Sequence, residues 1–169
     1  MSDRVARPDT ITLRRASWTG DRANIEFVRR QVFVQEQGVP EHEEWDAADG
    51  TCHHVLALAG KRDAVGTGRL EATGKIGRVA VLPQYRGTGV GSEIVSHLVN
   101  LAAELGLTQV YLHSQTTAVG FYERFGFRAV GPEFDEAGIP HRRMHLGIEQ
   151  RDEQQVGRHG HPEHPFDAR

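Results

Sequence analysis

The sequence contains a single cysteine and no long apolar run, and each shortage excludes a class of protein. Cys52 alone cannot form a disulfide within the 169-residue chain, which favours a reducing compartment such as the cytoplasm. The opening stretch from Met1 to Trp18 has scattered arginines and no apolar block, which is typical of neither a secretion signal nor a membrane anchor. The other apolar runs are too short to span a bilayer, so we expect a cytoplasmic protein without a membrane partner.

A surplus of positive charge is also missing. The 20 lysines and arginines are outnumbered by 23 aspartates and glutamates, which gives a formal net charge of -3. Nucleic-acid-binding proteins usually show a basic excess, so we expect no nucleic-acid partner, and any anion site must be local. The 38% of apolar and 25% of charged residues fit one soluble globular domain.

The composition changes after Leu146, where polar residues, glycines, prolines and histidines take over. We expect one folded domain over residues 1–148 and a polar, histidine-containing tail without stable structure over residues 149–169, because the tail offers little apolar surface to bury. The histidines of the body are not spaced with carboxylates or cysteines as zinc ligands are, so no metal is expected.

The period of the apolar residues predicts strands and helices in alternation. The first helix is expected to be capped by Asp21 and to end near Gly38, and residues 39–51 are expected to form a loop. A longer helix is predicted over residues 89–105, and a short one ends at Gly126. The predicted strands cover residues 11–15, 55–59, 64–71, 77–82, 110–113, 128–130 and 142–146. The fold class is therefore α/β (α+β), a mixed, mostly antiparallel sheet flanked by helices.

The most informative stretch runs from Val79 to Gly91, where an apolar strand passes through a basic, glycine-rich turn into an amphipathic helix. Glycines let the backbone approach a ligand closely, and the first turn of a helix offers unpaired amides and partial positive charge. Arg86 adds a permanently charged fork, so a pyrophosphate is the expected guest. A nucleoside-triphosphate loop would need Lys-Ser or Lys-Thr after the last glycine, and a dinucleotide loop a different glycine spacing.

The spacing Arg86-x-x-Gly89-x-Gly91 resembles the acyl-CoA-binding signature of the GNAT acyltransferase superfamily. Residues 118–127, Ala-Val-Gly-Phe-Tyr-Glu-Arg-Phe-Gly-Phe, look like its later helix and the strand that follows. Residues 32–39 and the turn at residues 138–141 are similar to the ElaA-like branch of the superfamily. The resemblance covers about residues 13–146 and implies a GNAT-like domain.

The resemblance implies an acetyl-CoA site and a proton donor. The strand would pair its backbone with the pantetheine arm, the turn would hold the pyrophosphate, and Tyr122 would return a proton to the departing thiolate. Many relatives have an asparagine after the next strand; none occurs here, and Gln115 is the expected substitute. The implied coenzyme-binding residues are Val79, Ala80, Val81, Arg86, Gly87, Thr88, Gly89, Val90, Gly91, Gln115, Phe121 and Tyr122.

Transfer to an amine also requires a group that accepts the ammonium proton, and the sequence does not single one out. Glu71, Glu36, His113 and His54 each fall near a strand end or a loop edge, and all four stay open. Cys52 precedes two histidines, but neighbouring strand residues point to opposite faces, so we expect a small buried or edge cysteine rather than a nucleophile.

A segment rich in acid suggests the charge of the acceptor. Between Gln31 and Gly60 there is no lysine or arginine, and the acidic residues there are Glu36, Glu41, Glu43, Glu44, Asp46 and Asp49. Such runs are commonly solvated surface, but beside an acceptor cleft this one would attract cationic amines such as polyamines, amino sugars or lysine-like amines.

The leading interpretation is an acetyl-CoA-dependent N-acetyltransferase in which a small-molecule amine attacks directly within a ternary complex. A non-catalytic acyl-CoA sensor or regulatory module is the main alternative, and it would keep the phosphate turn without a competent acid and base. A nucleotide-dependent oxidoreductase is disfavoured by the glycine spacing. A monomer and a homodimer are both compatible with the sequence.

Overall fold

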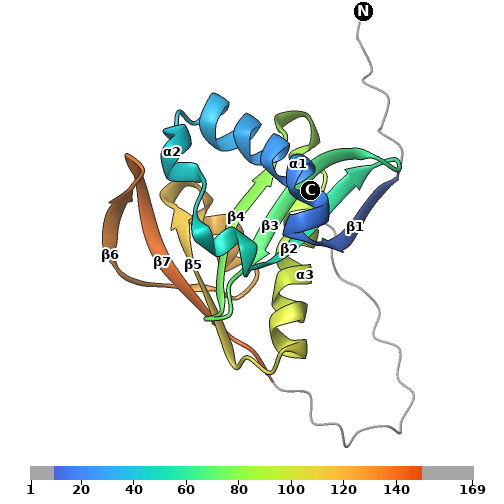
Figure 1. Cartoon of the computed structure of the whole chain (residues 1–169). Helices are drawn as coiled ribbons and strands as arrows, with labels where there is room; N and C mark the ends of the chain where they lie inside the picture. Colours follow the sequence, from blue (N-terminus) through green and yellow to red (C-terminus); the bar gives the residue numbers. More distant parts are fainter. Residues whose placement is uncertain (1–9, 150–169) are drawn as a thin grey trace, which may run out of the picture.

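One seven-stranded sheet organises residues 10–149, the part of the chain that this computed structural model describes. The strands run in the order β1-β2-β3-β4-β5-β7-β6, and only β4 and β5 are parallel neighbours. Figure 1 shows β1 and the β6–β7 hairpin at opposite edges of the sheet. The strands are β1 (Ile11–Ala16), β2 (His53–Ala59), β3 (Asp63–Leu70), β4 (Lys75–Val81), β5 (Gln109–Gln115), β6 (Arg128–Glu136) and β7 (Ile139–Gly147).

Helical segments connect these strands. Helix α1 (Trp18–Arg29) continues without a break into a π-helix, η1 (Arg30–Glu36), and is followed by α2 (Glu41–Glu44). Helix α3 (Val90–Glu104) and the short α4 (Val119–Glu123) lie later in the chain. The 3-10 turns are η2 (Ala47–Gly50), η3 (Pro83–Tyr85) and η4 (Thr116–Ala118). A mixed, mostly antiparallel sheet flanked by helices confirms the predicted fold class; most of the predicted tail lies outside the described residues.

Three local predictions were wrong. Ser17, not Asp21, caps α1: its hydroxyl accepts from the Gly20 amide at 2.9 Å, while Asp21 accepts from the Ser17 amide at 2.9 Å. The expected loop after η1 contains α2 and η2, which are too short to show a period. Strands β6 and β7 are longer than predicted, because most of their outer residues are exposed and carry no apolar alternation.

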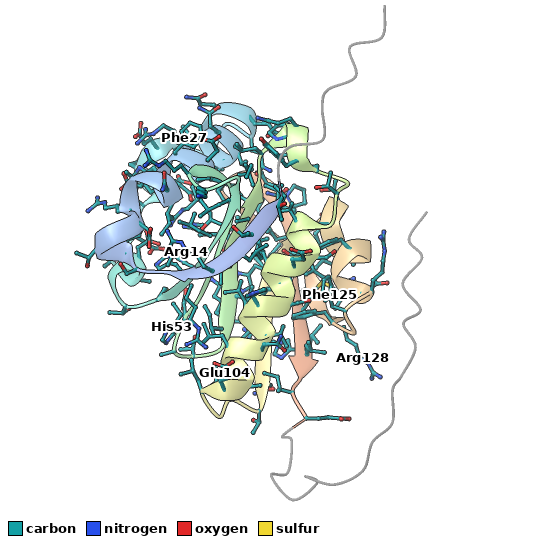
Figure 2. The ribbon with its side chains drawn as sticks, turned by 90° about the vertical axis from the view of Figure 1, so that its right-hand side faces the viewer. Arg14, Phe27, His53, Glu104, Phe125 and Arg128 are labelled. Atoms are coloured by element: carbon teal, nitrogen blue, oxygen red, sulfur yellow. The ribbon has the colours of Figure 1, made fainter. Side chains whose placement is uncertain are left out.

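Two glycines in β3 set the distance between α3 and the sheet. A Cβ atom on Gly66 would lie 2.8 Å from Ile94 Cδ1, and one on Gly68 would lie 2.9 Å from Leu98 Cδ1. The alternate residues of β3, Thr67 and Arg69, must therefore point to the other face, and Arg69 there meets the segment after α2. Figure 2 looks onto α3, with Glu104 at its lower end.

Strands β4 and β5 part shortly after they begin. Their parallel pairing is limited to Lys75 with Tyr111 and Ile76 with Leu112, although β4 continues to Val81 and β5 to Gln115. Arg78 has φ = 50°, and the β3–β4 register shifts beside it, so a bulge bends β4 at this point. Beyond Ile76, the edge of β4 that faces β5 therefore has no strand partner.

Candidate active site

The turn between β4 and α3 has the backbone of an anion-binding loop. Gly87 and Gly89 have φ values of 73° and 89°, which glycine adopts most readily. The first amide of α3 that bonds back to a carbonyl is that of Glu93, to Gly89 at 3.0 Å. The preceding helical amides therefore lack an intrahelical acceptor and point out of the positive end of the helix dipole. This geometry suits a pyrophosphate.

Arg86 is the charged residue of this turn, and it is already engaged. Its two terminal nitrogens each lie 2.7 Å from a carboxylate oxygen of Glu36, and its Nε donates to the Val81 carbonyl at 3.0 Å. The hydrogen bond from Arg86 holds the pKa of Glu36 below its usual value. Two residues expected in separate roles, anion ligand and base, are thus brought together, and a paired carboxylate is a poor proton acceptor.

Helix α4 brings its aromatic residues against the start of α3. A Cβ atom on Gly91 would lie 3.6 Å from the Phe121 ring and 3.7 Å from a methyl group of Val81. The implied coenzyme residues Val81, Gly91 and Phe121 are therefore neighbours in space. The unpaired edge of β4 leads directly to them.

Tyr122 is buried, with 9% of its surface exposed, and packs edge-to-face on Phe121 and Phe127. Its hydroxyl has no hydrogen-bond partner among residues 10–149. Burial raises the pKa of Tyr122 to about 12, so the phenol keeps its proton at neutral pH. A phenol hydroxyl that no protein group engages can donate its proton to a ligand.

A carboxylate flanked by two imidazoles lies beyond the parting of β4 and β5. The Nδ1 atom of His113 is 3.1 Å from Oε1 of Glu136, and Nε2 of His141 is 3.6 Å from Oε2. Partial burial opposes ionisation of Glu136, but the hydrogen bond from His113 and the nearby charges of His141 and Lys75 keep its pKa below the usual value. Phe134 meets the His113 ring edge-on at 5.0 Å.

This histidine cluster, His113, Glu136 and His141, fixes the orientation of His113. An ionised Glu136 accepts from Nδ1, which leaves Nε2 of a neutral His113 as a proton acceptor. The sequence nominated His113 but missed Glu136 and His141. The hairpin register that brings Glu136 back over β5, across 23 positions, leaves no local pattern in the sequence.

The other base candidates are less free. Glu71 lies 3.6 Å from the Arg69 guanidinium. His54 is 2% exposed, its Nε2 is 2.8 Å from the Asp49 carbonyl oxygen, and it stacks on Trp18. Gln115, expected to contact the coenzyme, donates to the Gln37 side chain at 2.7 Å and so ties β5 to the end of η1.

The acidic segment is neutralised by arginines from other elements. Arg29 on α1 bonds Glu44 at 2.7 Å and Asp49 at 2.6 Å, and Arg69 on β3 bonds Asp46 at 2.8 Å and Asp49 at 2.7 Å. Arg30 pairs with Glu41, Arg78 with Glu44, and Arg86 with Glu36. The expected attraction for cationic amines therefore loses its basis, because most of these carboxylates already have a cation.

Cys52 is not activated as a nucleophile, because burial outweighs the pKa-lowering effect of Arg69. Burial raises its pKa to about 11, and the neighbouring carboxylates of Glu71, Asp49 and Asp46 act in the same direction. Within residues 10–149, no three histidine, cysteine, aspartate or glutamate side chains are arranged to hold a metal ion. No helix in that range is long and apolar enough to cross a membrane.

Comparisons with known proteins identify the family of the fold. The model of the acetyltransferase (GNAT) domain family matches residues 19–148. The uncharacterized N-acetyltransferase YjcF of Bacillus subtilis is 40% identical over 122 residues, which cover 70% of this chain and 86% of that protein. Among solved structures, ElaA of Escherichia coli superimposes with a TM-score of 0.72 at 27% identity, over 80% of this chain and 99% of its own. An acyl-CoA N-acyltransferase from Pseudomonas aeruginosa gives 0.71 at 29% identity, with 80% and 99% covered.

Proposed function

Because the chain belongs to the GNAT family of acetyltransferases, we propose that it moves an acetyl group from acetyl-CoA to a primary amine by direct attack within a ternary complex. The observation that carries the proposal is a continuous path of unpaired backbone groups. The unpaired edge of β4 runs from the bulge at Arg78 to the free amides at the start of α3. An extended amide-containing arm that ends in a pyrophosphate matches both parts of this path.

Acetyl-CoA supplies the acetyl group as a reactive thioester. The lone pair of the neutral amine forms the new C–N bond to the acetyl carbon, the C–S bond breaks, and its electron pair leaves with the sulfur. The nitrogen must lose one proton and the sulfur must gain one, so the protein has two proton transfers to assist.

We assign the first transfer to His113. Its Nδ1 is held by Glu136 at 3.1 Å, which presents Nε2 as the acceptor for the amine proton. The ring is partly exposed, with 22% of the side chain accessible, and β5 places it just past the last residue that pairs with β4. It combines access with an orienting carboxylate, which Glu36, Glu71 and His54 do not.

We assign the second transfer to Tyr122. A phenol with a pKa of about 12 is a weak donor to an aqueous thiolate. The same burial that raises this pKa also raises that of a thiol, as half-buried Cys52 shows with a pKa of about 11. The difference between the pKa of the phenol and the pKa of the thiol therefore stays small inside the site.

Two substitutions test coenzyme binding and chemistry separately. Gly89→Trp fills the turn between β4 and α3, and tryptophan cannot keep the 89° φ angle of this residue without strain. It should therefore abolish acetyl-CoA binding in calorimetry.

Tyr122→Phe should leave binding intact and slow thiol release by about 100-fold or more. Unchanged turnover in Tyr122→Phe at every pH would show that another group is the acid. Tight coenzyme binding by the parent protein without thiol release on any amine would favour an acyl-CoA sensor.

A further inference from the structure

Arg143, beside His113, has no acidic partner among residues 10–149. Arg143 lies directly opposite His113 in the β5–β7 pairing, so the two side chains project from the same face of the sheet. The guanidinium carbon is 4.4 Å from the centre of the Tyr111 ring, and Nε donates to Nε2 of His145 at 2.8 Å. These two contacts fix the plane of the guanidinium. Both terminal nitrogens lack an acceptor within residues 10–149.

The charges around Arg143 favour an anion. The other arginines near the parting of β4 and β5 are occupied, Arg78 by Glu44 and Arg86 by Glu36. Lys75 pairs with Tyr111 across the β4–β5 register and adds a second cation to this face. Glu136 contributes one negative charge nearby, against the positive charges of Arg143 and Lys75. The open part of the face therefore carries a positive surplus.

This face is also accessible. Helix α1 packs against β3 and β4, and the β6–β7 hairpin extends beyond it towards the far edge of the sheet (Figure 1). The Tyr111 ring lies under the guanidinium and stacks on the His145 ring, with 5.8 Å between the ring centres, and Arg143 is exposed. In Figure 2, Arg128 of the same hairpin points away into the surroundings.

From this geometry we infer that the acceptor amine also carries an oxyanion, a carboxylate or a phosphate, which Arg143 binds while the amine faces Nε2 of His113. A planar guanidinium with two free terminal nitrogens is the side chain best suited to bidentate binding of such groups. The inference rests on the proposed acetyl transfer and reverses the sign of the acceptor charge expected from the acidic segment, whose carboxylates are paired.

Matched amines test the inference. The pairs are β-alanine with β-alaninamide and 2-aminoethyl phosphate with ethanolamine, within a wider panel of amino acids and their amides, assayed by thiol release from acetyl-CoA. The anionic member of each accepted pair should have the higher kcat/KM, by about 10- to 100-fold, the range of a charge-assisted hydrogen bond. Preference for the carboxylate or for the phosphate pair identifies the oxyanion.

Variants locate the effect at Arg143. Arg143→Gln should raise KM for anionic acceptors by about 10- to 100-fold, leave KM for neutral amines and acetyl-CoA binding unchanged, and remove the preference. Arg143→Lys should restore part of it, because the charge returns without the planar fork. Arg62→Gln, in the exposed turn between β2 and β3, is the control and should behave like the parent protein.

The outcomes distinguish a wrong acceptor charge from a wrong reaction. If neutral amines are acetylated as well as their anionic counterparts, or if Arg143→Gln lowers both equally, the inference is wrong and acetyl transfer stands. If acetyl-CoA binds but no amine in the panel releases thiol, the proposed function fails and the inference falls with it.

Discussion

Two clusters of charged side chains lie on either side of β4 and differ in their cations. In the arginine cluster, Arg29, Glu44, Asp49 and Arg69 have side chains that are 1–4% exposed. In the histidine cluster, Glu136 meets two imidazoles, and the exposed fractions run from 9% to 43%. A guanidinium keeps its proton at every pH that the fold survives, whereas an imidazole exchanges one near neutrality. The first cluster therefore holds the fold, and the second is able to move protons.

Breaking the arginine cluster should have the largest effect on stability. Arg29→Met leaves Glu44 and Asp49 buried with one cation fewer, and removing one partner of a buried ion pair costs about 3–5 kcal/mol. Chemical denaturation should show this loss in the free energy of unfolding. Arg22→Met, in the same helix but with a side chain 60% exposed, should change it by less than about 1 kcal/mol. A loss below 1 kcal/mol for Arg29→Met would mean that the cluster is not structural.

Breaking the histidine cluster should affect rate rather than stability. His113→Gln removes the proposed proton acceptor and should lower kcat by about 100-fold, with acetyl-CoA binding and the free energy of unfolding unchanged. His97→Gln, on the exposed surface of α3, is the matched control.

A second variant of that cluster tests position rather than chemistry. Glu136→Gln keeps the size of the side chain and removes the charge that orients His113, so kcat should fall by about tenfold while acetyl-CoA binding is unchanged. If His113→Gln is as active as the parent protein, the amine proton leaves by another route, and the histidine cluster has no role in proton transfer.

Acid should weaken the ion pairs that Asp46 and Asp49 make with the arginines. The hydrogen bond from Arg69, against an opposing effect of burial, lowers the pKa of Asp46 from 3.8 to about 2. Burial also opposes ionisation of Asp49, but its hydrogen bonds with Arg29 and Arg69 leave its pKa below the usual value. Because the folded pKa is depressed, this stabilisation is complete above the unfolded value and is lost as the pH falls from about 4 towards 2. Thermal unfolding of Asp46→Asn should depend less on pH over that range. Parallel pH profiles for both proteins would contradict this assignment.

The smallest effect concerns Cys52, which lies beside the arginine cluster. Its pKa of about 11 predicts slow alkylation at pH 8 in the folded protein and rapid alkylation once the chain is denatured. Cys52→Ser should leave turnover unchanged. Fast alkylation in the folded state would show that Arg69 activates the thiol more than burial suppresses it.

The sequence predicted local features well and distant pairings poorly. Helix α3 has enough apolar repeats to be recognised, so both of its ends were predicted within one position. The glycine-rich turn before it consists of consecutive residues and was therefore visible in the sequence. The pairing of Arg29 with Asp49 and the return of Glu136 to His113 depend on strand order and hairpin register. These long-range contacts leave no periodic pattern, which is why the acidic segment was interpreted as free charge.

Gly66 and Gly68 of β3 affect the position of the turn between β4 and α3, although they do not touch it. Each missing methyl group lets α3 rest directly on the strand, and the N-terminus of that helix carries the amides of the turn. In Gly68→Ala the new methyl group would push against Leu98 and move α3 away from the sheet. The distance of the β4–α3 turn from the parted strands is thus set by two glycines that lie about twenty positions earlier in the chain.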